Sequence, residues 1–363
     1  MDNTPDPAPS DGARAIARHG PIPTLDQLHA LISVEHGQVR PSDVTLYGMV
    51  RDELFNLPAF FHYYRSLGVD QFLIFDDGST DGSREFLIQQ PDCAVLTSDV
   101  RYGDEIAVCY PDGAVRNFRW GLVLKSAIPR LFLDDQFAVY ADADEFIILP
   151  APIATLRELF DALRRRKAVC AFANLVEFYP NNIQDLEGDP NPRSFDDMIR
   201  LYPYFDGVPL NEIVPGAQPQ AVAISASTRL FRHYRMRERR SWLDRLLLRP
   251  KPVKRMRRQT DTIKTPIVRW RPDVWLEGSH YANLAPSSDI VLATAHFKFT
   301  HDLSRRIESA VEWNSYAQDS GAYHAYKALL DAMSRVRGDF TYGKSVAYQG
   351  PTQLEALGLV QYR

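Results

Sequence analysis

The sequence predicts an α/β fold with a mostly parallel central sheet flanked by helices. Short apolar runs rich in β-branched and aromatic residues alternate with segments of helical periodicity, a pattern typical of strand–helix–strand units. Two acidic segments, residues 76–81 and 142–145, each follow such a run directly. Because ligands of open α/β sheets bind beyond the carboxyl ends of the strands, we expect the polar chemistry at one edge of the sheet.

The first unit starts with residues 44–50 (VTLYGMV), which predict a buried strand. Asn56 offers a cap for the next helix, and Pro58 is tolerated in the first helical turn. Apolar residues then recur at helical spacing up to Gly68, which we expect to end the helix.

Later segments repeat this alternation. Residues 72–75 (FLIF) predict a second strand, and Ser83 is expected to cap the helix that follows the loop 76–82. Further strands are predicted over residues 94–97, 137–141 and 169–176, helices over residues 120–133, 153–166 and 304–335, and a short closing element over residues 354–360.

The chain divides into four predicted regions. Residues 1–23 carry too little apolar surface to offset the entropy of ordering and are predicted to be disordered. Residues 44–180 form the sheet-bearing half, residues 181–303 a second half with a basic insert at 231–258, and residues 304–363 a helical end. No apolar signal segment or membrane-spanning run is present. We therefore expect a cytoplasmic protein, with peripheral attachment to the inner face of a membrane left open.

Composition narrows the possible functions. The formal net charge is −4, which does not favour general binding to nucleic acid. Cys93, Cys109 and Cys170 stand far apart without a CxxC pair, so we expect neither a thiolate metal site nor a redox dithiol.

Residues 140–146 (YADADEF) are the strongest chemical signal. Asp142, Asp144 and Glu145 place three carboxylates within four residues at the end of a predicted strand, and their mutual repulsion favours a bound cation. Carboxylate oxygens suit Mg²⁺ or Mn²⁺, which also bind substrate phosphates and stabilise a departing diphosphate. A solvated acidic turn is the alternative explanation.

The earlier segment, residues 76–83 (DDGSTDGS), supplies small residues for a tight turn and carboxylates that can accept hydrogen bonds from a base or a ribose. By itself it is also explained as a turn that caps a helix. The combination of this loop with the later DxD segment is far more specific than either alone.

The chain resembles the family 2 glycosyltransferases, in particular a branch whose first strand ends in R-x-E. The matching segments are residues 50–53 (VRDE), DDGSTDGS, VYADADEFIILP, KTPIVRW from Lys264, GSHY from Gly278, AHFKF from Ala295 and the tail around LEALGLV. The resemblance implies a GT-A fold, in which residues 44–180 form a Rossmann-like half that binds a nucleotide sugar and residues 181–303 face the acceptor.

The resemblance also implies site residues. Asp77 matches the aspartate that contacts the base, with Arg51 and Glu53 beside the nucleotide. Arg116 and Asn117 match an Arg-Asn pair near the diphosphate. Asp142 is expected to face the ribose and the metal, Asp144 to be the main metal ligand, and Glu145 to support them. His296 resembles a late histidine that serves some members of the family as an additional metal ligand. The residues that the resemblance implies are therefore Arg51, Glu53, Asp77, Arg116, Asn117, Asp142, Asp144, Glu145 and His296.

Other side chains are candidates by residue type. Lys264 and Arg269 can hold diphosphate oxygens, and His280 is an alternative to His296. Attack by an acceptor hydroxyl needs a general base. We expect Glu177 or Asp206 in that role, with Glu212 and Glu277 as further candidates.

The insert at 231–258 combines many Lys and Arg residues with an apolar patch at residues 242–248. Such a segment can lie on an anionic membrane surface and present a membrane-bound acceptor, or it can be a solvated loop.

The sequence therefore predicts a metal-dependent glycosyltransferase, inverting, that moves a sugar from a nucleotide diphosphate, UDP by family analogy, to the hydroxyl of a glycan, a lipid-linked or another acceptor. Mn²⁺ or Mg²⁺ is the expected cofactor, and nucleic acid is not an expected partner. The alternatives are a nucleotidyltransferase and an inactive module that binds a carbohydrate or a partner.

Overall fold

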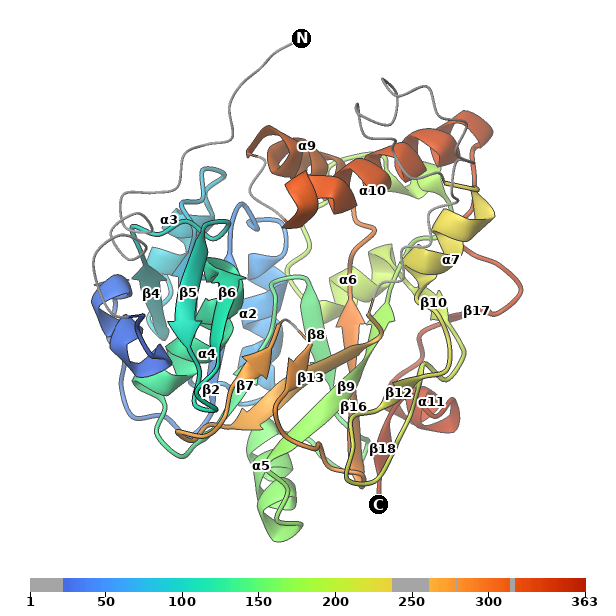
Figure 1. The fold of residues 1–363 in the computed structure, drawn as a ribbon. Helices are drawn as coiled ribbons and strands as arrows, with labels where there is room; N and C mark the ends of the chain where they lie inside the picture. The colour runs from blue at the N-terminus through green and yellow to red at the C-terminus, as the bar shows by residue number, and fades with distance from the viewer. Residues whose placement is uncertain (1–21, 237–260, 279, 314–316) are drawn as a thin grey trace, which may run out of the picture.

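A large mixed sheet forms the centre of the computed structural model, which describes residues 22–236, 261–278, 280–313 and 317–363 (Figure 1). The predicted tail, residues 1–23, and the basic insert, residues 231–258, fall mostly outside the described residues. The strands are β1 (Ser33–His36), β2 (Thr45–Val50), β3 (Gln71–Asp76), β4 (Cys93–Thr97), β5 (Glu105–Cys109), β6 (Val115–Arg119), β7 (Phe137–Tyr140), β8 (Glu145–Ile148), β9 (Cys170–Glu177), β10 (Tyr204–Asp206), β11 (Asn211–Glu212), β12 (Gln220–Ala221), β13 (Ile263–Arg269), β14 (Leu276–Glu277), β15 (Tyr281–Ala282), β16 (Ile290–His296), β17 (Ser345–Ala347) and β18 (Gln361–Tyr362).

Helices cover this sheet on both faces. They are the 3₁₀ segments η1 (Leu25–Leu31) and η2 (Ile183–Leu186) and the α-helices α2 (Leu57–Ser66), α3 (Ser83–Ile88), α4 (Trp120–Phe132), α5 (Leu156–Arg165), α6 (Phe195–Leu201), α7 (Ala226–His233), α9 (Leu303–Trp313), α10 (Ala317–Val336) and α11 (Pro351–Ala356). Among the described residues no helix combines the length and the apolar composition that crossing a membrane requires.

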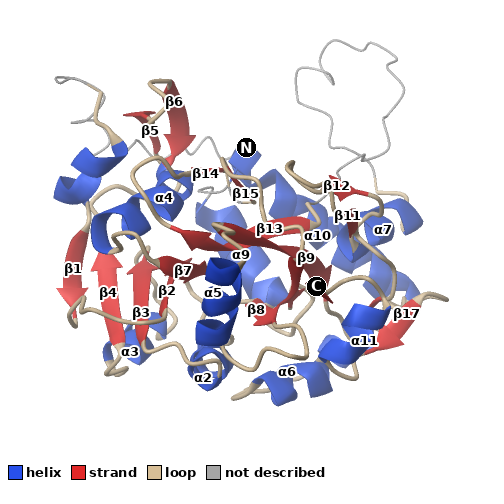
Figure 2. Cartoon of the chain, turned by 90° about the horizontal axis from the view of Figure 1, so that it is seen from below, coloured by secondary structure: helices blue, strands red, loops and turns tan. Residues whose placement is uncertain are grey.

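The strand order is β1-β4-β3-β2-β7-β13-β9-β16-β18, with β8 paired to β16 (the β1 to β7 side is clearest in Figure 2). The pairings β4/β3, β3/β2, β2/β7 and β9/β16 are parallel. Because β13 is antiparallel to both of its neighbours, β9 and β16 run in the same direction as β7. The prediction of a mostly parallel sheet is confirmed for these central strands, and β1, β8, β13 and β18 are the antiparallel exceptions.

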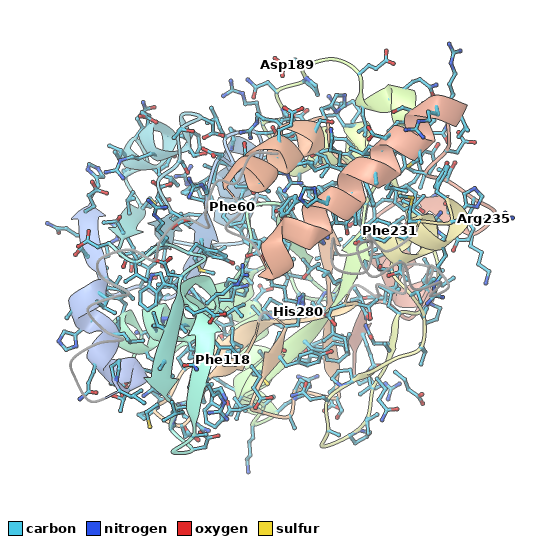
Figure 3. The ribbon with its side chains drawn as sticks, turned by 45° about the horizontal axis from the view of Figure 1, so that its top comes forward. Phe60, Phe118, Asp189, Phe231, Arg235 and His280 are labelled. Carbon is cyan, nitrogen blue, oxygen red and sulfur yellow. The ribbon has the colours of Figure 1, made fainter. Side chains whose placement is uncertain are left out.

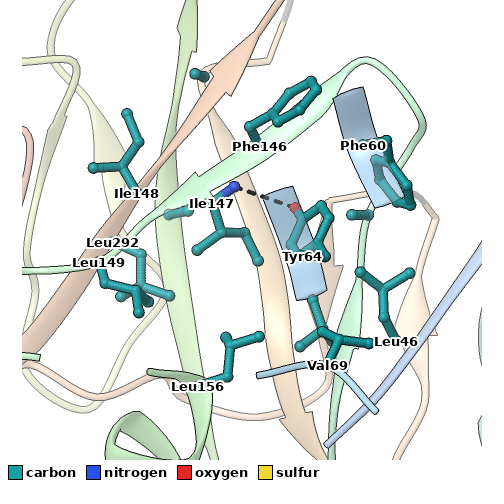
Figure 4. Close-up of a cluster of buried hydrophobic side chains, with 14 of the residues drawn as sticks. Leu46, Phe60, Tyr64, Val69, Phe146, Ile147, Ile148, Leu149, Leu156 and Leu292 are labelled. Atoms are coloured by element: carbon teal, nitrogen blue, oxygen red, sulfur yellow. Dashed lines mark hydrogen bonds between the residues drawn. The ribbon is translucent and has the colours of Figure 1, made fainter. Parts of the chain in front are cut away.

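The alternation of side chains along β2 builds the two faces of the core. Leu46 joins the cluster formed with α2 and α5, whereas Tyr47 joins the cluster formed with η1 and α4. Within the first cluster the buried hydroxyl of Tyr64 donates to Glu145 O over 2.9 Å and accepts from Ile147 N over 3.2 Å (Figure 4). This hydroxyl ties α2 to the start of β8, the strand that begins at the last residue of the DADE segment.

The predicted strands and helices of the sheet-bearing half are confirmed within a few residues. Asn56 is the N-cap residue of α2, as predicted, but the predicted cap at Ser83 is wrong. The side chain of Asn56 makes no capping bond and donates instead to Glu53 Oε2 over 2.8 Å. The cap before α3 is Gly82, at φ 97°, and Ser83 begins the helix. Ser83 Oγ accepts from Glu53 N over 2.9 Å, so both side chains hold the β2–α2 loop rather than a helix end.

The carboxy-terminal end is less purely helical than the sequence predicts. Alongside α9, α10 and α11 it contributes β17, which pairs with β10, and β18, which pairs with β16. Figure 1 shows α9 and α10 beyond the end of the sheet toward which β16 runs. These two helices pack with α7 through a separate apolar cluster.

Candidate functional site

A cavity of about 280 Å³ lies where the carboxyl ends of β2, β3, β7 and β16 meet, with α9 and α10 on its other side. The shared strand direction brings together side chains that are as far apart in the sequence as residues 51 and 296. Six residues predicted from the sequence line it, namely Arg51, Glu53, Asp77, Asp142, Asp144 and His296.

Pairing of β8 with β16 explains how His296 reaches the DADE segment. In this antiparallel register His296 lies opposite Glu145, and Phe297 N donates to Asp144 O over 2.9 Å. The imidazole Nε2 of His296 consequently lies 3.4 Å from Oδ2 of Asp144. A carboxylate and an imidazole therefore share one wall of the cavity.

Asp144 is the carboxylate most firmly held in the cavity. Its Oδ2 also accepts from Arg306 Nη1 over 2.8 Å, and its side chain is 11% exposed. Burial acts to raise the pKa of Asp144, but His296 and Arg306 outweigh burial and hold it below the usual range. The group is thus ionised at neutral pH and paired with Arg306.

Asp142 and Glu145 both bond one cation, Lys264, which does not line the cavity. Lys264, on β13, donates from Nζ to Asp142 Oδ2 over 2.7 Å and also bonds Glu145 Oε2. The Tyr140 hydroxyl donates to the other oxygen of Asp142 over 2.5 Å. Lys264 is therefore directed at the carboxylates and does not line the cavity.

Asp77 is oriented by two donors. Arg51 Nη1 lies 3.0 Å from its Oδ2, and Tyr102 N donates to its Oδ1 over 3.0 Å. Burial raises the pKa of Asp77 despite these donors. Its carboxylate lines the cavity in a fixed orientation, as a group that contacts a base or a ribose requires.

The rest of the loop 76–83 mainly holds the neighbouring loop in place. Thr80 N donates to Asp52 Oδ1 over 2.6 Å, and Leu54 N donates to Asp81 Oδ2 over 3.0 Å. Asp52 takes a left-handed φ of 54°, which costs energy for a residue with a side chain. These bonds fix the turn that carries Arg51 and Glu53 into the cavity.

Glu53 is an acid that faces the cavity and whose pKa is raised strongly. Burial raises its pKa from 4.5 to about 7, and Arg306 opposes the shift. Its Oε1 lies 3.6 Å from Arg306 Nη1. Near neutral pH this side chain can therefore carry or release a proton.

Besides Lys264, three predicted nucleotide-binding residues do not line the cavity. Arg116 and Asn117 lie on β6, in the hairpin marked by Phe118 in Figure 3, where Arg116 pairs with Asp112. Arg269 lies at the opposite end of β13 from Lys264, beside Phe137 in the register, and pairs with Asp135 over 2.6 Å.

The proposed bases lie behind or outside the cavity lining. Glu177 accepts from Ser227 N over 2.5 Å and from Ser227 Oγ over 2.7 Å at the start of α7. Asp206 accepts from the Tyr179 hydroxyl and from two nitrogens of Arg229, each over 2.9 Å.

The remaining candidates are also elsewhere. Glu212 and Glu277 are exposed on the short strands β11 and β14. His280, labelled in Figure 3, contacts Ile263 O over 2.8 Å through Nδ1 and lies 3.4 Å from Asp261 through Nε2. Burial lowers the pKa of His280 to about 4.

Among the polar residues of the cavity lining, sequence analysis missed Tyr102, Lys298, Arg306, Tyr323 and Tyr326. Lys298 had a local signal, because it follows His296 by two residues at the end of β16. Arg306 on α9 and Tyr323 and Tyr326 on α10 had no such signal in the sequence. A helical pattern alone does not reveal which strand ends the helix covers.

The donor set can be compared with what a divalent ion requires. Among the described residues no three His, Cys, Asp or Glu side chains converge to hold a metal. Asp144 and His296 supply two neighbouring donors, and His296 Nδ1 is buried without a hydrogen-bond partner in the described part of the chain. Mg²⁺ is commonly held by one or two carboxylates, with water and substrate phosphates completing its coordination. Two donors beside a cavity fit that pattern.

Compared with protein-family models and with curated protein sequences, the chain matches none.

Proposed function

We propose that this protein is a glycosyltransferase of the GT-A kind that uses a nucleotide diphosphate sugar and a divalent cation. The observation that carries the proposal is the convergence of Asp77 from β3 with Asp142 and Asp144 from β7 in one cavity at the carboxyl edge of the sheet. To bind the nucleoside of the donor, a site needs an oriented hydrogen-bond acceptor. To bind its diphosphate, a site needs positive charge. The cavity offers both, and the resemblance favours a UDP-sugar.

Each end of the cavity has a distinct task in this proposal. Asp77, oriented by Arg51 and Tyr102 N, accepts from the base or the ribose. Asp144 and His296, with Asp142 on the same wall, hold Mn²⁺ or Mg²⁺. When bound, such an ion supplies the positive charge that stabilises a departing nucleoside diphosphate.

The acceptor hydroxyl must lose a proton as it attacks the sugar. Tyr326 lines the cavity, its hydroxyl donates to Ser227 Oγ over 3.0 Å, and Ser227 Oγ donates to Glu177 Oε1 over 2.7 Å. In our proposal the acceptor proton moves to Tyr326 Oη while Tyr326 gives its proton to Ser227 and Ser227 gives its own to Glu177. Asp206 is less suited, because it is already paired with Arg229.

The proposal is tested by calorimetry with UDP, GDP and dTDP, with and without Mn²⁺. One of these nucleotides should bind only in the presence of the metal, and Asp144→Asn should abolish that binding. The matched control is Asp112→Asn, which removes a carboxylate of the β5–β6 hairpin.

Three results would overturn the proposal. Binding that survives in Asp144→Asn would remove the role of the DADE segment. Release of pyrophosphate from a nucleoside triphosphate would indicate a nucleotidyltransferase. Nucleotide binding without any cleavage of the bound nucleotide sugars would indicate an inactive binding module.

A further inference from the structure

Arg306 joins two acids that come from different strands. Its Nη1 lies 2.8 Å from Asp144 Oδ2 and 3.6 Å from Glu53 Oε1, and its Nε lies 3.8 Å from Asp302 Oδ2. The side chain is 11% exposed. A single guanidinium on α9 is thereby a shared counter-ion for two acids that follow β2 and β7.

This position sets Arg306 in competition with a divalent ion. The oxygen that Arg306 contacts, Asp144 Oδ2, is also the one that lies 3.4 Å from His296 Nε2. A guanidinium and a divalent cation beside one oxygen repel each other strongly when they are shielded from water. Asp144 can therefore bind the ion fully only if Arg306 leaves Oδ2.

The cavity also offers Arg306 a second partner once a donor is bound. Lys298 lines the same cavity and takes part in none of the ion pairs formed between described residues, while its Nζ lies 4.8 Å from the Tyr326 ring. Arg306 and Lys298 thus add two cations to a cavity whose lining also holds Arg51 and several acids. A diphosphate is the anion that this pair suits, because a guanidinium binds phosphate oxygens through two parallel bonds.

We propose that Arg306 is an exchangeable counter-ion: it neutralises Asp144 and Glu53 in the empty site and passes to the donor diphosphate when Asp144 binds the divalent ion. This inference rests on the proposed function. It names Arg306 as the residue that couples binding of the divalent ion to binding of the donor diphosphate. The helix itself need not move, because Arg305 anchors its start through Asp302 and Asp81 while Arg306 faces the cavity.

The exchange predicts effects of opposite sign in Arg306→Gln. Mn²⁺ alone should bind more tightly, because its competitor at Asp144 is gone. UDP in the presence of Mn²⁺ should bind roughly tenfold more weakly, because a charge-assisted contact to phosphate is lost. Arg306→Lys should change Mn²⁺ binding little, because it keeps the charge, and should weaken UDP binding to an intermediate extent, because it lacks the planar fork.

The experiment measures free Mn²⁺ by electron paramagnetic resonance and UDP binding by calorimetry, on the full chain. Arg305→Gln is the matched control: it is the adjacent arginine of α9, does not line the cavity and reports any general loosening of that helix. Thermal unfolding of each variant shows whether it is folded. If Arg306→Gln does not fold, Arg306→Lys still tests the inference, through little-changed Mn²⁺ binding and weaker UDP binding.

The outcomes separate this inference from the proposed function. Tighter Mn²⁺ with weaker UDP in Arg306→Gln, and neither in Arg305→Gln, supports the exchange. A wild type that binds UDP with Mn²⁺ while Arg306→Gln shifts both affinities in the same direction overturns the exchange and leaves the proposed function standing. A wild type that binds no nucleoside diphosphate overturns both.

Discussion

Lys264 donates from Nζ to Asp142 Oδ2 over 2.7 Å while only 1% of its own side chain is exposed. It also bonds Glu145, so one buried cation serves two of the three carboxylates of the DADE segment. Burial acts to lower the pKa of Lys264, but the two acids outweigh burial and raise it. Asp144 is left as the carboxylate of this segment that pairs across the cavity with Arg306.

The first prediction concerns this buried cation. Lys264→Met leaves Asp142 and Glu145 without their shared partner, and removing one side of a buried ion pair typically costs about 3–5 kcal/mol of unfolding free energy. Arg269→Met, on the same strand but in a half-exposed pair with Asp135, should cost less than about 1 kcal/mol. Urea unfolding of the two variants measures the difference, and equal costs would show that Lys264 does not sustain the segment.

A second prediction follows from the raised pKa of Glu53. Its ordinary value is 4.5 and its folded value about 7, so between these values the folded state binds more protons than the unfolded state. Stability therefore falls as pH rises through this window. Glu53→Gln removes that contribution, worth at most about 3 kcal/mol. Unfolding at about pH 5 and about pH 8 should show the variant gaining stability relative to the wild type at the higher pH, whereas a pH-independent difference would contradict the prediction.

Asp77 provides a third prediction, which separates the two ends of the cavity. Asp77→Asn removes the charge that Arg51 and Tyr102 N orient, so UDP should bind about tenfold more weakly in the presence of Mn²⁺. Inorganic pyrophosphate should bind as it does to the wild type, since it lacks the nucleoside. Asp99→Asn, an exposed acid outside the cavity, is the control. Equal losses for UDP and pyrophosphate would place Asp77 at the phosphate end instead.

Local sequence patterns predicted the parallel strands well, because each is a short apolar run with a clear boundary. The strand β13 was harder to place: its residues 263–269 insert antiparallel between β7 and β9, more than a hundred residues away from β7 in the chain. Nothing in a local pattern specifies such a partner. The failed cap at Ser83 has the same origin, since its hydroxyl accepts from Glu53 N, which only the folded loops bring near.

The cavity lining could be predicted from the sequence where a polar residue comes soon after the end of a strand. Asp77, Asp142 and Asp144 follow strand ends directly, so the sheet alone delivers them to one edge. Lys264 and Arg269 share a strand, but the register of β13 sends one to the DADE segment and the other to the far edge. Arg306 was invisible in the sequence because its partners are strand ends that a carboxy-terminal helix meets only in the folded molecule.

The last prediction concerns the route by which the acceptor proton leaves. Tyr326→Phe removes the hydroxyl that donates to Ser227 but keeps the ring that lies 4.8 Å from Lys298 Nζ. Binding of Mn²⁺ and UDP should therefore stay within about twofold of the wild type. Release of UDP from the UDP-sugar should slow about a hundredfold, the lower end of what general-base catalysis contributes.

Three further variants decide whether this loss reflects a relay. Glu177→Gln should slow UDP release as much as Tyr326→Phe, and the double variant should be no slower, because the two residues would act on one proton. Tyr323→Phe removes a hydroxyl from the same cavity three residues earlier on α10 and should leave the rate near that of the wild type. Additive losses in the double variant, or an equal loss in Tyr323→Phe, would mean that these hydroxyls only shape the cavity and that the proton leaves by another path.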